Sequence, residues 1–527
     1  MQKEILLGDE AVALGAIHAG ISGVYGYPGT PSTEAFEYVE RLSKKFNVHA
    51  TWSANEKVGL EEALGMSFAG KRSLVTMKHV GLNVAADPFM NSAITGTNGG
   101  LVILVCDDPG MHSSQNEQDT RYFADFGLVP CFEPKDQQEA YEMTRMAYDY
   151  SERHKVPIIM RLTTRLAHSR GNVNIAEVRA QNELTEKPSR KEWVLLPSHA
   201  RVQYANLVKK QNDFIDESMK SEFNFLKLNQ ESKLLGIIVS GIATNYLNEH
   251  LSRLEFMPSI LKISQYPLPM DMVAKIYEHC DELLVIEEGY PYIEKILTSG
   301  FSFKNKKISG KLNERLPRCG ELNPDIVADA LGLKNDNAMF DKPAQVPGRP
   351  PSLCKGCSHI DTYNAINEIM ADFPNGAVFS DIGCYTLGAL PPYEAIDTCI
   401  DMGASISAAS GASHAGMHPC FAVIGDSTFG HSGMTPLLGA AYENNNITVF
   451  ILDNETTAMT GSQLSIASGE RLLSIIKGLG VDEEHLKVIN PLPKFHVENV
   501  EIIKKEVGYK GLSVIVPRRA CIQIKRK

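Results

Sequence analysis

The sequence predicts an α/β protein made of three doubly wound parallel-sheet domains. Short β-rich segments alternate with stretches long enough for amphipathic helices along most of the chain. The 527 residues give room for about three domains, and hydrophobic (43%) and charged (22%) residues occur in the proportions of a globular protein. These observations exclude a mostly disordered, collagen-like or coiled-coil chain.

The first predicted domain spans residues 1–170. It begins with an apolar helical pattern over 9–19, and another helix is expected at 57–69. The predicted strands are short apolar or β-branched runs at 23–27, 48–52, 73–77, 101–106 and 156–161. Strands that alternate with helices in this way form parallel sheets.

Four further segments follow the first domain. Residues 171–233 lose the strand pattern and are rich in charge, which predicts a solvated helical linker. A second α/β domain is predicted for 234–333, a Pro-rich connector for 334–351 and a third α/β domain for 352–527. The strands of the last two domains are expected at 234–240, 260–263, 283–286, 377–379, 421–424, 447–452 and 512–516.

Charge and hydropathy narrow the class of function. A net charge of −11 without a basic stripe argues against nucleic-acid binding. No apolar run approaches the roughly 18 residues of a membrane span, and Glu4 and Asp9 interrupt the apolar core that a signal peptide needs. Ten cysteines are too sparse in so long a chain for a disulfide scaffold. We therefore expect a cytoplasmic protein with reduced thiols that acts on small molecules.

The most informative stretch joins two predicted strands through one helix. Gly425-Asp426-Ser427 ends the first strand, and Asn454 follows the second strand after 26 intervening residues. Ligands collect at the carboxyl ends of such strands, and the oxygens of Asp and Asn suit Mg²⁺. Pro436 is expected in the first turn of the intervening helix. The alternative is an ordinary strand end at which Asp426 caps a helix.

Two polar sites are candidates in the first domain. In the turn after the strand 23–27, Thr30 is expected to cap a helix and Pro31 to take its first position. Glu56 stands where a strand ends and a helix begins. Each site also fits a purely structural role, the first as a capped turn and the second as a carboxylate at a helix N-terminus.

Six motifs give the sequence a resemblance to one family. They are Tyr27-Pro-Gly-Thr-Pro-Ser-Thr-Glu34, Asn55-Glu-Lys57, Met77-Lys-His-Val-Gly-Leu-Asn83, Cys354-Lys-Gly-Cys-Ser-His359, Asp381-Ile-Gly-Cys384 and Gly425-Asp-Ser-Thr-Phe429. Together they resemble the alpha subunit of indolepyruvate:ferredoxin oxidoreductase, over nearly the whole chain. The Asp426–Asn454 spacing is also similar to the thiamine diphosphate signature, in which a second glycine stands where this chain has Ser427.

The resemblance implies a fold of the thiamine diphosphate enzyme type, similar to transketolase and pyruvate:ferredoxin oxidoreductase. Residues 1–170 would be the pyrimidine-binding domain, 234–333 a transketolase C-terminal-like domain, and 352–527 the domain for diphosphate and Mg²⁺. The implied reaction is oxidative decarboxylation of aryl 2-oxo acids, such as indolepyruvate and phenylpyruvate, to aryl-acetyl-CoA. Electrons would pass to ferredoxin or another low-potential acceptor. A beta subunit is expected, in an assembly of two alpha and two beta chains.

The resemblance also assigns roles to residues at matching positions. Glu56 would activate the aminopyrimidine of thiamine diphosphate, and Thr30 would face the substrate. Lys78 and His79 are candidates for contact with the substrate carboxylate or for acid/base work, with a solvent-facing turn as the alternative. The residues expected to bind the cofactor are Pro28, Gly29, Glu56, Gly425, Asp426, Ser427 and Asn454. The expected Mg²⁺ ligands are Asp426, Asn454 and the main-chain carbonyl of Thr456.

In the wider 2-oxoacid oxidoreductase group, four cysteines hold a [4Fe-4S] cluster. The counterparts here would be Cys354, Cys357, Cys384 and Cys521. Cys399 and Cys420 compete with Cys521 for the fourth place, and zinc or free buried thiols are alternatives to a cluster.

The family's alpha subunit commonly continues into a ferredoxin-like segment with Cys-x-x-Cys-x-x-Cys runs, and no such run follows Pro517 here. Two further hypotheses therefore stay open beside the oxidoreductase. One is a non-oxidative thiamine-dependent 2-oxo acid decarboxylase, which needs no exit for electrons. The other is a non-catalytic scaffold, against which the presence of both Glu56 and the Asp426/Asn454 pair counts.

Overall fold

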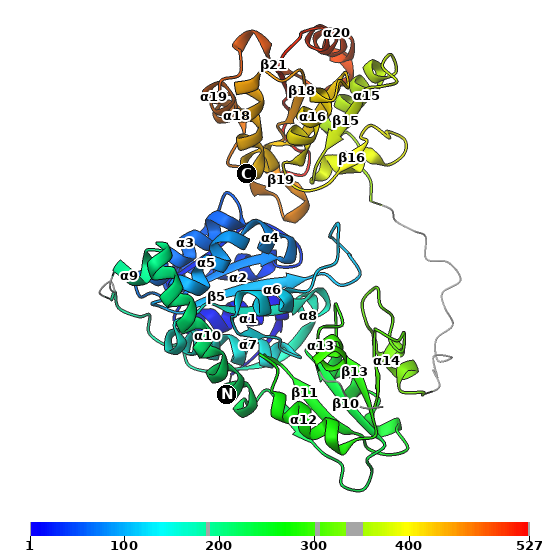
Figure 1. Ribbon diagram of the computed structural model, residues 1–527. Coiled ribbons are helices and arrows are strands. Elements are labelled where there is room, and N and C mark those ends of the chain that lie inside the picture. Colours follow the sequence, from blue (N-terminus) through cyan, green and yellow to red (C-terminus); the bar gives the residue numbers. More distant parts are fainter. Residues whose placement is uncertain (1, 186–189, 301–305, 334–350, 525–527) are drawn as a thin grey trace. The chain divides into compact units, whose positions relative to one another are not determined.

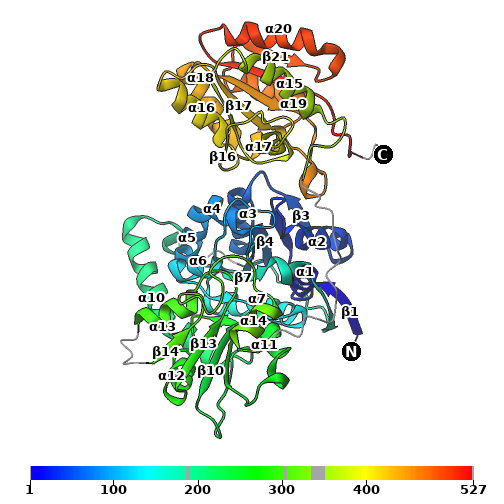
Figure 2. The same ribbon diagram turned by 90° about the vertical axis from the view of Figure 1, so that its right-hand side faces the viewer.

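The computed structural model describes residues 2–185, 190–300, 306–333 and 351–524. The chain divides into two compact units, Met1–Lys342 and Pro343–Lys527. Figures 1 and 2 show the first unit in blue to green and the second in yellow to red. The predicted connector 334–351 lies almost wholly outside the described residues. None of the described helices has both the length and the apolar character needed to cross a bilayer.

A seven-stranded sheet forms the centre of the first unit. Across the sheet the strands are β3 (His49–Trp52), β2 (Gly23–Gly26), β4 (Ser73–Lys78), β5 (Leu101–Asp107), β7 (Ile158–Thr163), β6 (Cys131–Phe132) and β12 (Gln265–Tyr266). All neighbouring strands are parallel except β6 and β12. The central strands are buried on both faces. In β5 this burial explains the continuous apolar run of residues 101–106.

Helices cover both faces of this sheet, as the doubly wound prediction requires (Figure 1). In one group, α1 (Gly8–His18) packs against both α2 (Thr33–Phe46) and α7 (Gln137–His154). The other comprises α3 (Glu56–Phe68), α4 (His79–Val84), α5 (Ala86–Thr95) and α10 (Pro197–Lys220). The strand order reverses direction between β2 and β4, so the switch point of the sheet lies where the chain carries Thr30 and Lys78.

The second sheet of the first unit has five strands. In order they are β14 (Lys307–Ser309), β13 (Glu282–Ile286), β10 (Leu235–Ser240), β11 (Ser259–Ile263) and β9 (Phe225–Lys227). Only β9 runs antiparallel to its neighbour. Its surrounding helices are α11 (Ala243–Asn248), α12 (Met270–His279), α13 (Tyr292–Gly300) and α14 (Pro324–Ala330). One continuous hydrophobic core includes side chains from both sheets of this unit.

The charged stretch 171–233 differs in part from the predicted helical linker. It contains the long helix α10, as expected, and the short helix α9 (Arg190–Trp193). However, β8 (Arg170–Ile175) pairs antiparallel with β1 (Gln2–Leu7), and β9 extends the second sheet. The sequence missed both strands because edge strands carry polar residues on their open side and give no continuous apolar run.

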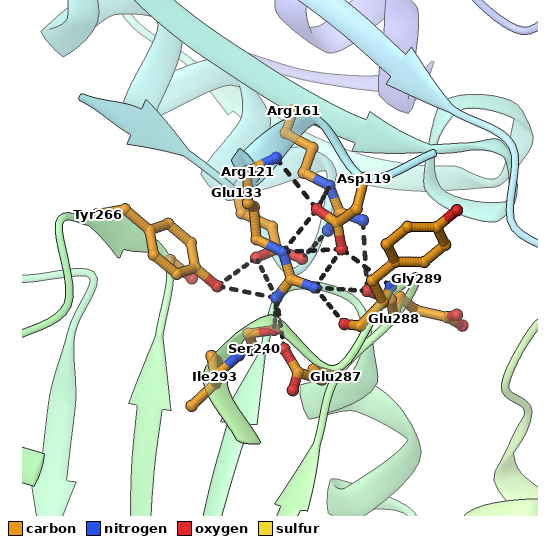
Figure 3. Close-up of polar contacts among 12 residues, drawn as sticks. Asp119, Arg121, Glu133, Arg161, Ser240, Tyr266, Glu287, Glu288, Gly289 and Ile293 are labelled. Atoms are coloured by element: carbon orange, nitrogen blue, oxygen red, sulfur yellow. Dashed lines mark hydrogen bonds and ion pairs between the residues drawn. The ribbon is translucent and has the colours of Figure 1, made fainter. Parts of the chain in front are cut away.

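A buried cluster of charged side chains joins the two sheets of the first unit (Figure 3). Arg121 donates to Oε2 of Glu287 at 2.9 Å, and Arg161 Nε donates to Oδ2 of Asp107 at 2.6 Å. Arg161 also pairs with Glu133. Removing one partner of such a buried pair leaves a charge without compensation, which typically costs about 3–5 kcal/mol. The cluster therefore fixes the second sheet against the first.

The second unit contains a six-stranded sheet in which all neighbouring strands are parallel. Its strands are, in order, β16 (Thr398–Cys399), β15 (Ala377–Ser380), β17 (Cys420–Gly425), β18 (Thr448–Leu452), β22 (Ser513–Pro517) and β21 (Leu486–Ile489). Separate hydrophobic cores lie on its two faces, one with α16 (Ala404–His414), α18 (Met434–Glu443) and α19 (Gly469–Gly478), the other with α15 (Ser358–Met370) and α20 (His496–Val507). The predicted α/β class with doubly wound parallel sheets is confirmed.

Candidate functional site

Glu56 is the first residue of α3 and lies just beyond the carboxyl end of β3. Asn55 caps this helix, because its side chain accepts a hydrogen bond from the Val58 N–H at 3.0 Å. The Glu56 side chain is only 5% exposed. It lies against the backbone of α4, where a β-carbon added to Gly81 would stand 2.7 Å from its Cγ and Oε1. Gly81 is therefore the residue whose small size makes room for the Glu56 carboxylate.

The Pro28-Gly29-Thr30 turn follows β2 at the same edge of the sheet. The predicted helix cap is wrong, because α2 begins at Thr33 and not after Thr30. Gly29 explains the later start: its carbonyl accepts from the Ser32 hydroxyl at 2.8 Å and its N–H donates to the Thr33 hydroxyl at 3.0 Å. Thr30 is left half-buried in the turn.

Lys78 ends β4 and His79 begins α4, and both side chains are buried. The solvent-facing turn that was the alternative for this pair is therefore wrong. The aliphatic part of Lys78 packs against Gly29, where an added β-carbon would lie 3.3 Å from Cδ of Lys78. Burial lowers the pKa of Lys78, while the charges of Asp108 and Glu56 oppose that shift. The Pro28-Gly29-Thr30 turn, the Glu56 carboxylate and the Lys78 ammonium therefore lie together at the carboxyl ends of β2, β3 and β4.

The hydrogen bonds of His79 determine which of its ring nitrogens carries the proton. Nε2 lies 3.2 Å from the carbonyl oxygen of Asn116, and a carbonyl only accepts, so Nε2 is the donor. In the neutral ring, Nδ1 is then an acceptor. Nδ1 is buried and has no hydrogen-bond partner among the described residues. This nitrogen is free to accept a hydrogen bond or a proton from a ligand.

A residue that the sequence analysis missed completes this site. Asp108 follows β5 at the same sheet edge and accepts hydrogen bonds from the Ser113 N–H at 2.8 Å and the Thr164 hydroxyl at 2.7 Å. Burial alone would raise the pKa of Asp108, but these hydrogen bonds, with those of Ser114 and the charge of Lys78, lower it. The Asp107-Asp108-Pro-Gly run after a predicted strand was the signal that could have identified it.

Asp426 occupies the corresponding position in the second unit, directly after β17. Its Oδ1 accepts from the Ser427 N–H at 2.8 Å, and its buried Oδ2 has no hydrogen-bond partner among the described residues. Burial, and next the nearby charge of Asp453, raise the pKa of Asp426 to about 8. A buried carboxylate oxygen without a partner is the kind of group that a cation stabilises. Asp426 therefore fits a magnesium ligand.

Gly425 leaves room for an aromatic side chain beside Asp426. A β-carbon at Gly425 would lie 2.7 Å from Cε1 of Tyr385, and one at Gly383 would lie 2.3 Å from the same atom. The Tyr385 hydroxyl donates to Asp381. Asp381 follows β15 and is fully buried, and burial raises its pKa to about 7. These residues bring the ends of β15 and β17 together at the switch point of the sheet.

Asn454 lies beyond β18, two residues after Leu452, at the same edge as Asp426. Its Oδ1 accepts from the Thr456 N–H at 3.2 Å, and its Nδ2 lies 3.4 Å from Nε2 of His359. Burial lowers the pKa of His359 to about 4. The Ser427 hydroxyl lies 2.7 Å from the Thr457 hydroxyl, which ties the two predicted segments together. The ligand set proposed from sequence, Asp426, Asn454 and Thr456, thus gathers at one sheet edge.

The helix after Asp426 begins earlier than the sequence predicted. Residues Asp426–Thr428 form a helical turn, Phe429–Gly433 continue as a π-helix, and α18 follows with Pro436 in its first turn. Proline removes one backbone donor and its ring crowds the carbonyl four residues earlier, here that of Ser432. The wider π-helical turn before Pro436 accommodates both the missing backbone donor and the proline ring.

Four of the candidate cysteines lie near one another in the second unit. The pKa of Cys384 is raised to about 12, first by burial and then by the proximity of Cys357, Cys521 and Cys354. Cys399 is not among the thiols that chiefly raise the pKa of Cys384. Cys420 begins β17, at the opposite end of that strand from Asp426. Yet no group of three or more His, Cys, Asp or Glu side chains within the described ranges is arranged to hold a metal ion.

The four thiols also lie close to the candidate cofactor residues. The Cys521 N–H donates to the carbonyl of Asn454 at 3.0 Å. Cys357 directly precedes the first residue of α15, and the same helix carries His359. Glu56 and the Lys78–His79 pair belong to the first unit, whereas Asp426, Asn454 and the cysteines belong to the second. Each unit therefore contributes its own set of polar groups at the carboxyl ends of its parallel strands.

Two family models match the chain. Residues 14–226 match the model described as pyruvate flavodoxin/ferredoxin oxidoreductase, thiamine diphosphate-binding. Residues 381–482 match the thiamine pyrophosphate enzyme, C-terminal TPP binding domain. The first match includes Glu56, Lys78 and His79, and the second includes Asp426 and Asn454. The candidate residues of each unit thus lie inside a segment typical of thiamine diphosphate enzymes.

Comparison with known proteins gives similarity over almost the whole length. Indolepyruvate oxidoreductase subunit IorA of Archaeoglobus fulgidus is 37% identical over 99% of this chain and 86% of that protein. The subunit of the same name from Thermococcus kodakarensis is 36% identical, with 99% and 86% coverage. A solved structure, 2-oxoglutarate:ferredoxin oxidoreductase from Magnetococcus marinus with 2-oxoglutarate, coenzyme A and succinyl-CoA bound, shares the fold (TM-score 0.52, 17% identity, 63% of this chain and 65% of that one). The chain therefore belongs to the thiamine diphosphate-dependent 2-oxoacid oxidoreductases, in the indolepyruvate oxidoreductase alpha-subunit family.

Proposed function

We propose that the protein catalyses oxidative decarboxylation of aryl 2-oxo acids, of the indolepyruvate and phenylpyruvate type, to aryl-acetyl-CoA. Electrons pass to ferredoxin or another low-potential acceptor. The observation that carries the proposal is the buried Glu56 carboxylate, held against Gly81 at a sheet edge in a chain 37% identical to a named indolepyruvate oxidoreductase subunit. A carboxylate in this position suits the activation of thiamine diphosphate.

Thiamine diphosphate, when bound, supplies the electron sink for decarboxylation of a 2-oxo acid. Glu56 would accept a hydrogen bond from its aminopyrimidine ring, and Pro28 and Gly29 would line the turn beside it. Asp426, Asn454 and the carbonyl of Thr456 would hold Mg²⁺, and Gly425 and Ser427 would lie next to the diphosphate. The Oδ2 of Asp426, which has no hydrogen-bond partner among the described residues, and the all-oxygen donor set support this assignment.

Lys78, His79 and Thr30 form the proposed substrate end of the site. The Lys78 ammonium would bind the substrate carboxylate, since it is buried beside Glu56 and Asp108. His79 would act as an acceptor through Nδ1, because Asn116 fixes the proton on Nε2. The Thr30 hydroxyl would face the substrate from the turn after β2.

The proposal includes a path for electrons and partner chains. Cys354, Cys357, Cys384 and Cys521 would hold a [4Fe-4S] cluster, supported by their mutual proximity. CoA is the proposed acyl acceptor, as the solved relative contains coenzyme A. A beta subunit would complete an assembly of two alpha and two beta chains, because the similar proteins are named as subunits. All ten cysteines are free, which suits a cytoplasmic location.

A second candidate function is non-oxidative decarboxylation of the same acids to aldehydes. It is favoured by one observation: no group of side chains in the part of the chain that the structure describes is arranged to hold a metal ion through His, Cys, Asp or Glu. Without a cluster, electrons from the cofactor would have no exit within this chain. The decarboxylase would use Glu56 and Asp426 in the same way.

Product analysis tests the proposal and separates the two candidates. The anaerobically purified chain with its partner subunit is supplied with thiamine diphosphate, Mg²⁺ and indolepyruvate, with CoA and a viologen dye present or omitted. The oxidoreductase forms acylated CoA with two equivalents of reduced one-electron dye per turnover. Aldehyde formed at the same rate with and without dye would instead establish the decarboxylase, and absence of either product would contradict both.

A further inference from the structure

The loop of residues 108–118 contacts both proposed substrate-binding side chains through its main chain. The carbonyl of Ser113 accepts from Nζ of Lys78 at 2.8 Å, and the carbonyl of Asn116 accepts from Nε2 of His79 at 3.2 Å. Ser113 also donates from its hydroxyl to the carbonyl of Thr30 at 3.1 Å. One loop therefore reaches three of the residues to which the proposed function assigns the substrate.

The start of this 108–118 loop is held by a buried carboxylate. Oδ2 of Asp108 accepts from the Ser113 N–H at 2.8 Å and from the Ser114 hydroxyl at 2.7 Å. Oδ1 accepts from Thr164 at 2.7 Å, which fixes the carboxylate against the segment after β7. Ser113 itself is exposed, so hydrogen bonds and not burial hold its backbone in place.

The end of the loop is held from the second sheet. The hydroxyl of Tyr290, which follows β13, donates to the carbonyl of Glu117 at 2.6 Å. The N–H of Tyr290 donates to Asp119 at 3.0 Å, and Asp119 pairs with Arg121 in the buried cluster (Figure 3). Inside the loop, the Gly110 N–H donates to the Glu117 carboxylate at 2.9 Å. The second sheet thus reaches the candidate site through this loop.

We propose that the 108–118 loop is the element that positions Lys78 and His79 for the substrate, and that Asp108 and Tyr290 are its two positioning residues. The inference rests on the proposed function, which assigns the substrate to Lys78 and His79. Neither positioning residue needs to touch the substrate. Asp108 fixes the position of the Ser113 carbonyl through its hydrogen bonds to Ser113 and Ser114. Tyr290 fixes the backbone next to Asn116 through its hydrogen bonds to Glu117 and Asp119.

Charge gives Asp108 a second effect on Lys78. The acidic groups that act on Lys78 are Asp108, directly after β5, and Glu56, at the start of α3, and both raise the pKa of Lys78 against the lowering effect of burial. Replacing Asp108 by Asn removes one of these charges. The pKa of Lys78 then falls, so the alkaline limb of the kcat/KM profile for the 2-oxo acid moves to lower pH.

The first experiment follows amide hydrogen exchange of the full chain in peptides that cover 109–118. The variants are D108N and Y290F, with Y246F as the matched control. Tyr246 is a buried tyrosine of α11 beside the second sheet, and its hydroxyl has no hydrogen-bond partner among the described residues. We expect D108N and Y290F to raise exchange in the loop by at least about tenfold and Y246F to leave it unchanged.

The second experiment measures steady-state kinetics of the same variants in the complex with the partner subunit. We expect kcat/KM for indolepyruvate to fall about tenfold in Y290F and about 10- to 100-fold in D108N, through a higher KM for the 2-oxo acid. The KM for CoA and the affinity for thiamine diphosphate should stay within about twofold of wild type. A merely structural role would change all three together.

The outcomes separate the inference from the proposed function. Loop exchange that stays at the wild-type level in D108N and Y290F overturns the inference whatever the activity. Faster exchange with unchanged kinetics for the 2-oxo acid overturns it as well, since the loop would then be held without positioning Lys78 and His79. A wild-type complex that turns over no aryl 2-oxo acid overturns the proposed function, and this is seen before any variant is made.

Discussion

The side chain of Glu56 lies in the space that Gly81 leaves open, with Cγ and Oε1 both 2.7 Å from the point where a β-carbon would stand. Real β-carbons almost never approach another heavy atom so closely, so any larger residue at position 81 must displace the carboxylate. The two residues come from different helices, α3 and α4. The glycine of the Met77–Asn83 motif is therefore a steric requirement of the candidate active site.

Replacing Gly81 by Ala is expected to reduce kcat/KM about 100-fold with little loss of stability, because a shift of about 1 Å in a catalytic group has effects of this size. The matched control is Gly65→Ala in α3, where an added β-carbon would have no described residue within 4 Å. Steady-state kinetics with indolepyruvate and thermal unfolding of both variants provide the measurement. Equal activity of the two variants would show that Glu56 does not need its present position.

Replacing Gly425 by Ala is expected to weaken binding of thiamine diphosphate with Mg²⁺ about tenfold or more, because the new methyl group would displace the Tyr385 ring that packs there. Gly439→Ala is the control, since in the described part of the chain nothing lies within 4 Å of its β-carbon position in α18. Isothermal titration of each variant in the presence of Mg²⁺ gives the affinities. The expectation fails if both variants bind the cofactor like wild type.

Cys384→Ser and Cys521→Ser are each expected to abolish bound iron, since a [4Fe-4S] cluster needs all four thiolates of its site. Cys399→Ser is the control, because Cys399 is not among the thiols whose proximity raises the pKa of Cys357 and Cys384. Iron and sulfide content of anaerobically purified protein, with the visible spectrum, provide the readout. Iron that is lost in Cys399→Ser and kept in Cys521→Ser would assign the fourth ligand differently.

Glu288→Gln is expected to change how stability depends on pH. Burial is the main cause that raises the pKa of Glu288 from 4.5 to about 7 in the folded chain, while Lys311 and the Leu322 N–H oppose it. A raised pKa means that the stability contributed by this group is present below about pH 4.5 and is lost as the pH rises through about 7. At pH 8 the loss amounts to at most about 3 kcal/mol, which the neutral Gln side chain avoids.

Thermal unfolding at pH 5 and pH 8 tests this prediction for Glu288. The variant should gain stability relative to wild type on going from pH 5 to pH 8. Glu249→Gln serves as the control because Glu249 is exposed at the end of α11. A difference between Glu288→Gln and wild type that is the same at both pH values would show that Glu288 is already ionised below pH 5.

The sequence predicted the long buried strands and the strand-end residues. β5, β17 and β18 carry continuous apolar runs because both of their faces are buried, and such runs are visible without a structure. The ends of the predicted strands then gave the positions of Glu56 and Asp426, because polar residues that follow a buried strand lie at the edge of the sheet.

Pairings that depend on distant parts of the chain could not be predicted in this way. The two residues of β12 form a strand only because they pair with β6, more than a hundred positions earlier in the chain. The contact of Gly81 with Glu56 and that of Ser113 with Lys78 likewise arise from three-dimensional packing. The start of α2 was misplaced for a local reason, because Ser32 and Thr33 both bond to Gly29 and hold the turn open past Thr30.

The measurement that tests the central claim most directly is the exchange of the C2 proton of bound thiamine diphosphate with deuterium, followed by NMR in wild type and Glu56→Gln. Glutamine keeps the shape of the side chain but removes the negative charge. The account predicts that the variant binds the cofactor with Mg²⁺ like wild type and exchanges the proton at least about 100-fold more slowly, as expected for loss of a positioned acid/base group. Exchange in Glu56→Gln at the wild-type rate would contradict the assignment of Glu56 as the activating carboxylate.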